Sequence, residues 1–178
     1  MLGKETLTSI STFILAKSLE LSGLSIRIIS YQTFNYHTVL TIMKDYDEKA
    51  LMDNIFSFAP LGFNRDSLAL KAYKYLDKKN DKKILHILTD LNPSDLRPIY
   101  KKGLRRNLSY EGDDALKLVE NEITNLRRRN LIIAGLINKK KDPNLSKRIF
   151  SSNFSYLLSP KLLSQRVALL IEKNLKKL

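Results

Sequence analysis

Residues 82–95 read Lys-Lys-Ile-Leu-His-Ile-Leu-Thr-Asp-Leu-Asn-Pro-Ser-Asp, and this stretch decides the expected fold. An apolar run that ends abruptly at turn-forming polar residues is typical of a parallel β-strand covered on both faces. In open α/β sheets, ligands bind outside the carboxyl ends of such strands. Asp90 and Asp95 therefore stand where recognition or chemistry is expected.

Other strands and helices are expected on either side of this strand. Residues 24–31 and 38–43, rich in β-branched and apolar side chains, predict an antiparallel hairpin at a sheet edge. Residues 131–137 predict another buried parallel strand, and residues 154–158 predict a last short one. Helical patterns alternate with these strands, which indicates an α/β fold with a doubly wound, mostly parallel, Rossmann-like sheet.

Two of the expected helices carry apolar residues that predict their buried faces. In the helix over residues 4–21 the stripe comprises Leu7, Ile10, Ile14 and Leu21, widened by Phe13, Leu15, Ala16 and Leu19. In the helix that follows residue 67 it comprises Leu68, Ala72, Tyr75 and Leu76. Asn64 or Asp66 suits the N-cap of this second helix, because a short oxygen-bearing side chain satisfies free amides of the first turn. Residues 96–109 show no clean periodicity and predict an exposed loop.

Composition predicts one globular domain over residues 1–178, with 43% hydrophobic and 28% charged residues. The sequence has no apolar run of the roughly 18 residues that a membrane span needs, and its start does not resemble a signal peptide. We therefore expect a cytoplasmic protein without a membrane span. The chain has no cysteine and only two histidines, so disulfides are excluded and a zinc hydrolase or His-based triad is poorly supplied. His86, on a buried strand, is expected to be a hydrogen-bonded core residue.

The net charge of +13 suggests a polyanionic partner as an alternative function. Residues 97–148 hold 14 Lys or Arg against 6 Asp or Glu. Nucleic acid or another polyanion would bind through residues 97–106, 127–129 and 139–141. These runs lack interleaved aromatic residues that could stack on bases, and no helix-turn-helix, zinc or RNP motif is present. Solvated lysine-rich faces explain the same charge.

Two spaced motifs carry a resemblance to a known family. Residues 64–70 read Asn-Arg-Asp-Ser-Leu-Ala-Leu, and residues 87–95 read Ile-Leu-Thr-Asp-Leu-Asn-Pro-Ser-Asp. With this order of elements, the chain resembles the von Willebrand factor type A domain. It is most similar to the bacterial branch that works beside MoxR-type AAA+ ATPases and cobalt-chelatase-like subunits, in which the motifs read Asn-x-Asp-Gly-x-Ala-Leu and Asp-Gly-x-Pro-x-Asp. Residues 110–112, Tyr-Glu-Gly, are a weaker match. The resemblance covers essentially the whole chain.

The resemblance implies a metal-ion-dependent adhesion site, in which magnesium sits at the carboxyl ends of the strands. Asp90 matches the aspartate of the third loop of that site. Asn64 and Asp66 occupy the second-loop region, without its usual threonine. Oxygen ligands around a hard cation, with one position open for a partner's carboxylate, suit such a site.

The chain departs from the family pattern at its start and at two glycines. Residues 1–4, Met-Leu-Gly-Lys, look like the tail of the first-loop motif Asp-x-Ser-x-Ser-Met-x-Gly-x-Lys, so we expect an N-terminally truncated domain that lacks the first, central strand. Ser67 and Leu91 stand at the glycine positions. We therefore expect no cofactor, with magnesium possible if the missing first-loop motif is supplied. Strands left unpaired by the missing one predict direct pairing, a homodimer or a strand recruited from another chain.

These observations favour a non-catalytic protein-protein interaction module. Its partner is expected to bind the face bearing Asn64, Asp66 and Asp90, and the resemblance implies an AAA+ ATPase or a metal-insertion complex as that partner. An enzyme is not expected, because the chain has no Gly-rich phosphate loop, no Gly-x-Ser-x-Gly and no His-x-Glu pair. Asp90 and Asp95 could be read as an acid-base pair, but turn and cap carboxylates explain them better.

Overall fold

The computed structural model describes residues 5–35, 37–46, 52–57, 59, 63–77, 83–99, 108–129, 131–138 and 142–175. Its elements in chain order are α1 (Glu5–Leu21), β1 (Ile28–Phe34), β2 (His37–Lys44), the 3₁₀ helix η1 (Met52–Ser57), α2 (Asp66–Leu76), β3 (Lys83–Thr89), β4 (Asp95–Ile99), β5 (Leu108–Tyr110), α3 (Gly112–Arg127), β6 (Leu131–Ile137), α4 (Pro143–Phe150), β7 (Phe154–Tyr156), the 3₁₀ helix η2 (Pro160–Leu162) and α5 (Leu163–Leu175). No helix in these ranges is long and apolar enough to cross a membrane.

The fold is α/β, as predicted, with a parallel sheet in the order β3-β6-β7. The predicted antiparallel hairpin is also present: β1 and β2 pair along their length up to Phe34 and His37. Within the described residues this hairpin forms a two-stranded sheet of its own and does not pair with β3. β4 and β5 form a second antiparallel pair inside the stretch that was predicted to be a loop, so that prediction was wrong at both ends of it.

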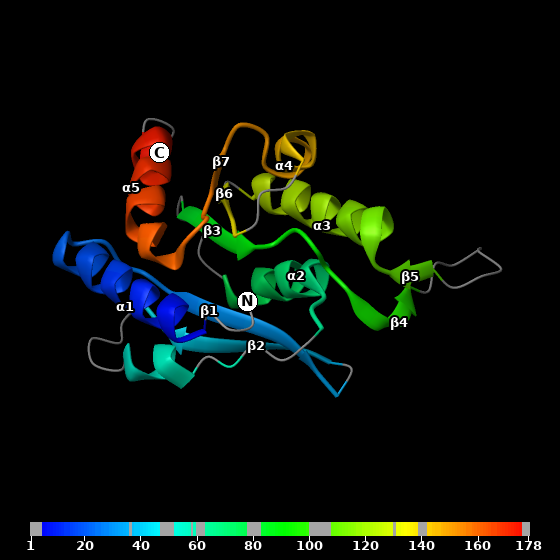
Figure 1. The fold of residues 1–178 in the computed structure, drawn as a ribbon, viewed down its shortest axis with the longest axis horizontal. Helices are drawn as coiled ribbons and strands as arrows, with labels where there is room; N and C mark the ends of the chain where they lie inside the picture. The colour runs from blue at the N-terminus through cyan, green and yellow to red at the C-terminus, as the bar shows by residue number, and fades with distance from the viewer. Residues whose placement is uncertain are drawn as a thin grey trace.

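Helices cover both faces of the parallel sheet, which makes the fold doubly wound and Rossmann-like. On one face Ile133 and Ile137 of β6 pack with α2, α3 and α4, and on the other Ala134 and Leu136 pack with α5. Figure 1 shows α1 and α5 on the left, α2 and α3 on the right, and β3 and β6 between them. Gly135 permits this packing, because a Cβ there would lie 2.5 Å from the ring of Phe150. The predicted buried strand at residues 131–137 is confirmed with the same bounds.

β3 is a parallel strand, as its sequence predicts, but its side chains are less buried than expected. Its faces touch both cores through Leu85 and Ile87 on one side and Ile84 and Leu88 on the other. Only Thr89 is fully buried, whereas nearly all of β6 is buried. The difference follows from position, because β6 has a neighbour on each side, whereas β3 pairs with β6 alone among the described residues.

The predicted buried faces of α1 and α2 were right only in part: Ala16 of the predicted stripe of α1 is buried, but several of the predicted apolar residues are exposed. α1 buries Thr8, Ser9, Ser11 and Ala16 and exposes Ile10, Ile14 and Leu21. α2 buries Asp66, Ser67, Ala69, Leu70 and Tyr73 and exposes Leu68 and Tyr75. Polar contacts set the rotation of each helix: Glu20 of α1 pairs with the buried Lys44 at 2.9 Å, and the first residues of α2 are bonded to β1 and β5.

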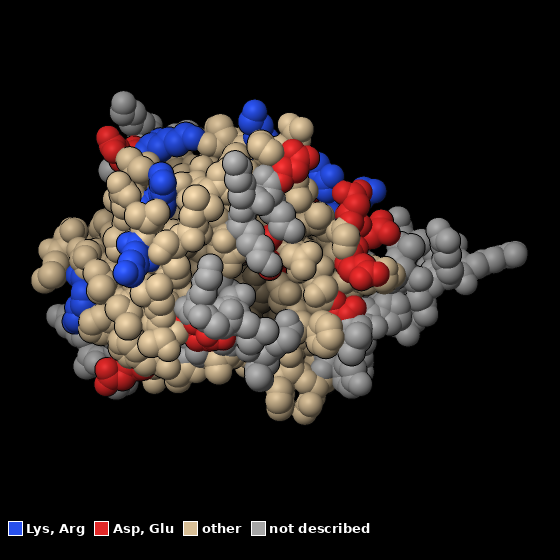
Figure 2. Space-filling model, viewed as in Figure 1, with Lys and Arg blue, Asp and Glu red and all other residues tan. Residues whose placement is uncertain are grey.

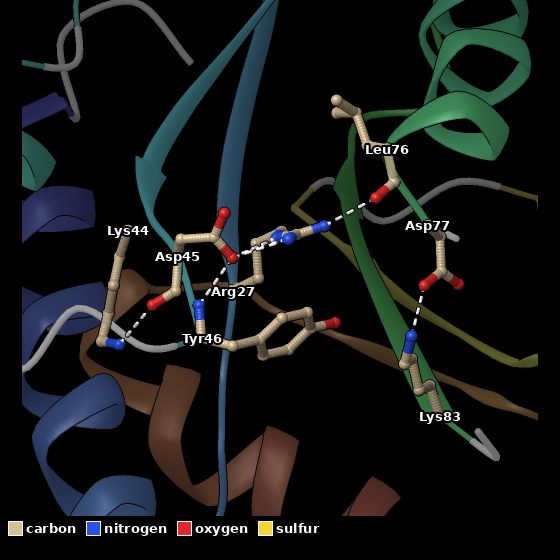
Figure 3. Close-up of polar contacts among 7 residues, drawn as sticks. All are labelled: Arg27, Lys44, Asp45, Tyr46, Leu76, Asp77 and Lys83. Carbon is tan, nitrogen blue, oxygen red and sulfur yellow. Dashed lines mark hydrogen bonds and ion pairs between the residues drawn. The ribbon is translucent and has the colours of Figure 1, made fainter. Parts of the chain in front are cut away.

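Polar contacts also join the hairpin to α2 and β3 at one end of the fold (Figure 3). Arg27, just before β1, donates to Asp45 at 2.8 Å and to the Leu76 carbonyl at 3.0 Å. Its guanidinium carbon lies 4.5 Å from the centre of the Tyr46 ring, and Lys83 Nζ lies 5.6 Å from the same centre. The hairpin and β3 are thus held in one arrangement, although no backbone pairing joins them in the part of the chain that the structure describes.

Candidate functional site

A buried carboxyl group, that of Asp66, lies at the centre of the predicted site. Its Oδ1 accepts hydrogen bonds from the Tyr31 hydroxyl at 3.1 Å and from Asn64 Nδ2. Its Oδ2 accepts a longer bond, 3.4 Å, from the hydroxyl of Thr89. The group therefore connects β1, the start of α2 and the end of β3.

Burial raises the pKa of Asp66 from 3.8 to about 6, because a charged carboxylate loses hydration there. The charge of nearby Asp90 adds to the rise, while the donors Tyr31, Asn64 and Thr89 oppose it by stabilising the charged form. The pKa of Tyr31 is raised well above its ordinary value, first by burial and then by the charge of Asp66. At neutral pH Tyr31 therefore remains the donor and Asp66 the acceptor.

Backbone bonds hold the loop before α2 in place. Asn64 and Ser94 exchange backbone hydrogen bonds of 3.0 and 3.1 Å, and Thr33 N–H donates to the Phe63 carbonyl at 3.2 Å. The loop is thus clamped between β1 and the segment after β3. The predicted cap was wrong: Arg65 is the N-cap of α2 and makes no side-chain cap bond in the described structure, and Asp66 is the first helical residue.

The turn after β3 places Asp90 beside this loop. Asp90 accepts a hydrogen bond from Asn92 N–H at 3.1 Å, and Thr89 Oγ1 accepts one from Leu91 N–H at 3.0 Å. Leu91 has φ of 53°, a left-handed conformation that is costly for leucine. Its side chain is buried in the core, and this packing offsets the backbone strain at a place where the resembling family has glycine.

A second group of contacts reaches the site from β5. Arg65 pairs with Asp95 and lies over the Tyr110 ring, 4.8 Å from its centre. The Tyr110 hydroxyl lies 2.6 Å from Ser67 Oγ and accepts from Ser67 N–H at 3.2 Å. Asp95 is therefore engaged in an ion pair with Arg65. This role explains Asp95 better than an acid-base pair with Asp90 does.

The structure brings the three predicted site residues to one end of the fold. Asn64 bonds directly to Asp66, and Asp90 is close enough for its charge to raise the pKa of Asp66. Sequence reasoning missed Tyr31, Thr89 and Tyr110 as members of the site. Thr89 directly precedes Asp90 in the deciding stretch, but the other two come from distant segments that only the fold brings near.

The residues present do not fit a magnesium site. Among the described residues there is no group of three or more His, Cys, Asp or Glu side chains that could hold a metal ion. Both oxygens of Asp66 already accept hydrogen bonds from protein donors, so a cation would have to compete with Tyr31, Asn64 and Thr89 for them. Magnesium also gives up its bound water molecules reluctantly. A buried carboxyl such as that of Asp66 is therefore a poor ligand for it.

His86 does not behave as predicted. Burial lowers its pKa to about 4, so the ring is neutral, but neither ring nitrogen has a hydrogen-bond partner within the described residues. The prediction of a hydrogen-bonded core histidine was therefore wrong. With a pKa of about 4 the ring is a weak base at neutral pH, so His86 is poorly suited to general-base catalysis.

Several basic side chains of the middle segment are engaged within the chain. Arg127 donates to the Ile149 carbonyl at 3.1 Å and Arg129 to the Lys74 carbonyl at 3.3 Å. Arg148 pairs with Asp113 at 2.9 Å and with Glu120 at 3.3 Å. The side chains at 97–106 and 139–141 lie outside the described ones. Figure 2 shows basic side chains over α1 and α5 and acidic ones gathered near the start of α3.

No protein-family model matches the chain, and comparison with curated proteins gave no match. The membership of the von Willebrand factor type A family therefore remains a proposal that rests on the two motifs and on the order of elements.

Proposed function

We propose that this chain is a non-catalytic protein-interaction module of the von Willebrand factor type A kind. Its partner binds what we call the loop face, made of Asn64, Asp90 and the exposed side chains of Phe34, Phe63 and Leu68. The observation that carries the proposal is the exposure of these three large apolar residues, at 53%, 42% and 40%, around an ordered polar centre. Aromatic anchors beside fixed polar groups are typical of protein interfaces.

The backbone places these apolar residues next to the site. The bond from Thr33 N–H to the Phe63 carbonyl brings the tip of the hairpin to the loop before α2, and Leu68 lies in the first turn of that helix. The buried carboxyl of Asp66 stabilises this arrangement through hydrogen bonds from Tyr31, Asn64 and Thr89. A surface held in this way loses little conformational entropy when a partner binds.

The resemblance suggests an AAA+ ATPase, or a complex that inserts a metal, as the partner. Asp90 provides the negative charge of the loop face, and a Lys or Arg of the partner would complement it. Magnesium is no part of this proposal, because the carboxyl oxygens of Asp66 already accept hydrogen bonds from the hydroxyls of Tyr31 and Thr89. Catalysis is no part of it either, since the carboxyl of Asp66, which accepts from the hydroxyls of Tyr31 and Thr89, is buried.

Site-specific photocross-linking in cells tests this proposal. A benzophenone amino acid replaces Phe63 in one variant and, as a matched control, Leu169 of α5, which is 49% exposed. We expect a discrete protein adduct from position 63 that is lost on Asp90→Arg, and none from position 169. Equal adducts from both positions, or an adduct at 63 that Asp90→Arg leaves unchanged, would contradict the proposal.

A further inference from the structure

An apolar stripe on α1 faces solvent. Ile10 is 41% exposed, Ile14 is 52% exposed, and Leu21, the last residue of the helix, is 88% exposed. The residues that α1 buries most deeply are small or polar ones, namely Thr8, Ser9, Ser11 and Ala16. Several of the largest apolar side chains of α1 are therefore on its outer side.

The spacing of this stripe is that of a coiled-coil seam. What we call the α1 seam comprises Leu7, Ile10, Ile14, Lys17 and Leu21. Successive members are three, four, three and four residues apart, so they occupy the a and d positions of two heptads. A narrow stripe of this kind packs against one other helix, whereas a helix that lies on a core has a wider apolar face.

The elements beside α1 lie on its flanks and leave the seam exposed. Leu15 packs with the core under α5, and Ala16 packs with Met43 and Ile55. Figure 1 shows α1 at the left edge of the molecule, with α5 above it and η1, in teal, below it. Phe56 of η1 is half-exposed beside the helix and extends the apolar surface.

The exposed apolar area is large enough to indicate an interface. Half-exposed side chains at four or five positions amount to an area on the order of 300–600 Å², which is the size of the largest apolar patch on a typical monomer and is often functional. The sequence predicted that this stripe would be buried, because its spacing is helical and its residues are apolar. A second helix laid along the seam would bury it.

A second copy of the chain supplies a helix that matches the seam. In an antiparallel pair, Ile10 of each helix lies opposite Ile14 of the other, and a two-fold axis repeats the contact. In the same register Lys17 lies opposite Leu7. The methylene groups of Lys17 cover that leucine while its ammonium group reaches water.

The charge of Lys17 determines the orientation of the pair. In a parallel pair the two Lys17 side chains would lie side by side in an apolar seam, and like charges in contact are unfavourable. In the antiparallel register they are ten residues apart along the seam, or about 15 Å at the rise of an α-helix. Each Lys17 also has Glu20 of its own helix 3.8 Å away. The antiparallel pair is thus the one that the charges permit.

We propose that the α1 seam is a dimerisation surface, on which α1 of a second copy of this chain lies antiparallel with Ile10 opposite Ile14. The seam is separate from the loop face, and either proposal can fail without the other. Two heptads bury less than the roughly 800 Å² per partner of a standard interface, so we expect a weak dimer with a Kd on the order of 10–100 µM. Unfolding measured at about 1 µM therefore reports the monomer.

Sedimentation velocity of the full chain at increasing concentration tests the proposal. We expect a reversible monomer–dimer equilibrium, and Ile14→Asp should raise its Kd at least about tenfold by placing a charge in the seam. The matched control is Leu169→Asp on α5, which also replaces a half-exposed apolar residue and should leave the Kd unchanged. A wild-type chain that stays monomeric up to about 300 µM would overturn the proposal, since the occupant would then have to be another protein. Equal weakening by both substitutions would overturn it as well.

Removing the charge from the seam should have the opposite effect. Lys17→Leu should tighten the dimer at least about tenfold, because a polar residue at a seam position costs stability. Its control is Lys117→Leu on α3, where the lysine is exposed and, like Lys17, paired within its own helix. An unchanged Kd for Lys17→Leu, or equal tightening by Lys117→Leu, would contradict the proposal.

Disulfide formation tests the orientation, because the chain has no cysteine of its own. Ile10→Cys and Ile14→Cys chains, one of them lengthened by a tag, are mixed in equal amounts and oxidised. The antiparallel register brings the two different positions opposite each other, within reach of a disulfide, so the mixed product should exceed both symmetric ones. Symmetric products alone would mean parallel helices and would overturn the proposal.

Discussion

At the scale of single residues, Asp66 contributes most to the site, since its carboxyl joins β1, α2 and β3. Its pKa of about 6 in the folded protein lies above the ordinary value of 3.8. Folding therefore favours the protonated form. The resulting stabilisation is complete below about pH 4 and is lost as the pH rises through about 6.

Substituting Asp66→Asn should remove this pH dependence. The wild-type free energy of unfolding should fall by about 3 kcal/mol between pH 4 and pH 7 relative to that of the variant. Urea unfolding of both proteins at several pH values measures this difference, in which the shared titration of other groups cancels. Parallel pH profiles for the two proteins would show that Asp66 titrates normally.

The sequence predicted the site residues only in part. The grouping of Asn64, Asp66 and Asp90 follows from two local motifs, each next to the end of an element, so short-range pattern was enough. Tyr31 and Tyr110 contribute through their hydroxyls from other strands. Their role depends on which strand lies beside which, and a linear pattern does not contain that information.

At the scale of secondary-structure elements, the two parallel strands were easiest to predict. β3 and β6 are uninterrupted apolar runs bounded by polar residues. α4 was not predicted because it has only eight residues. Asp142 and Pro143 nevertheless mark its start, because proline favours the first helical position and Asp142 accepts a hydrogen bond from Asn144 N–H at 2.9 Å. The rotations of α1 and α2 were predicted only in part, because polar contacts as well as apolar packing determine which face is buried.

Two matched substitutions test the rotation of α1. Ile14 is 52% exposed and Ser11 is 7% exposed. Ile14→Lys should change the free energy of unfolding by no more than about 0.5 kcal/mol, whereas Ser11→Lys should cost more than about 2 kcal/mol by burying a charge. Urea denaturation measures both. The opposite order would mean that the apolar stripe faces inward, as the sequence alone suggested.

At the scale of the whole molecule, the sheet is divided. A hairpin and a three-stranded parallel sheet share two helical layers, and side chains at both ends hold them together, with no backbone pairing between them among the described residues. The division explains why β3 is only half-buried. The loop face lies where the two halves meet, beside the carboxyl of Asp66.

Amide hydrogen exchange within β3 of the isolated chain tests this division most directly, because neighbouring residues of one strand serve as controls for each other. Leu85, Ile87 and Thr89 face β6, so their amides should exchange slowly, at rates near those of β6 itself. Ile84, His86 and Leu88 face the open edge, and their amides should exchange at least about tenfold faster. Uniform slow exchange along all of β3 would show that both edges are paired, and would contradict the account.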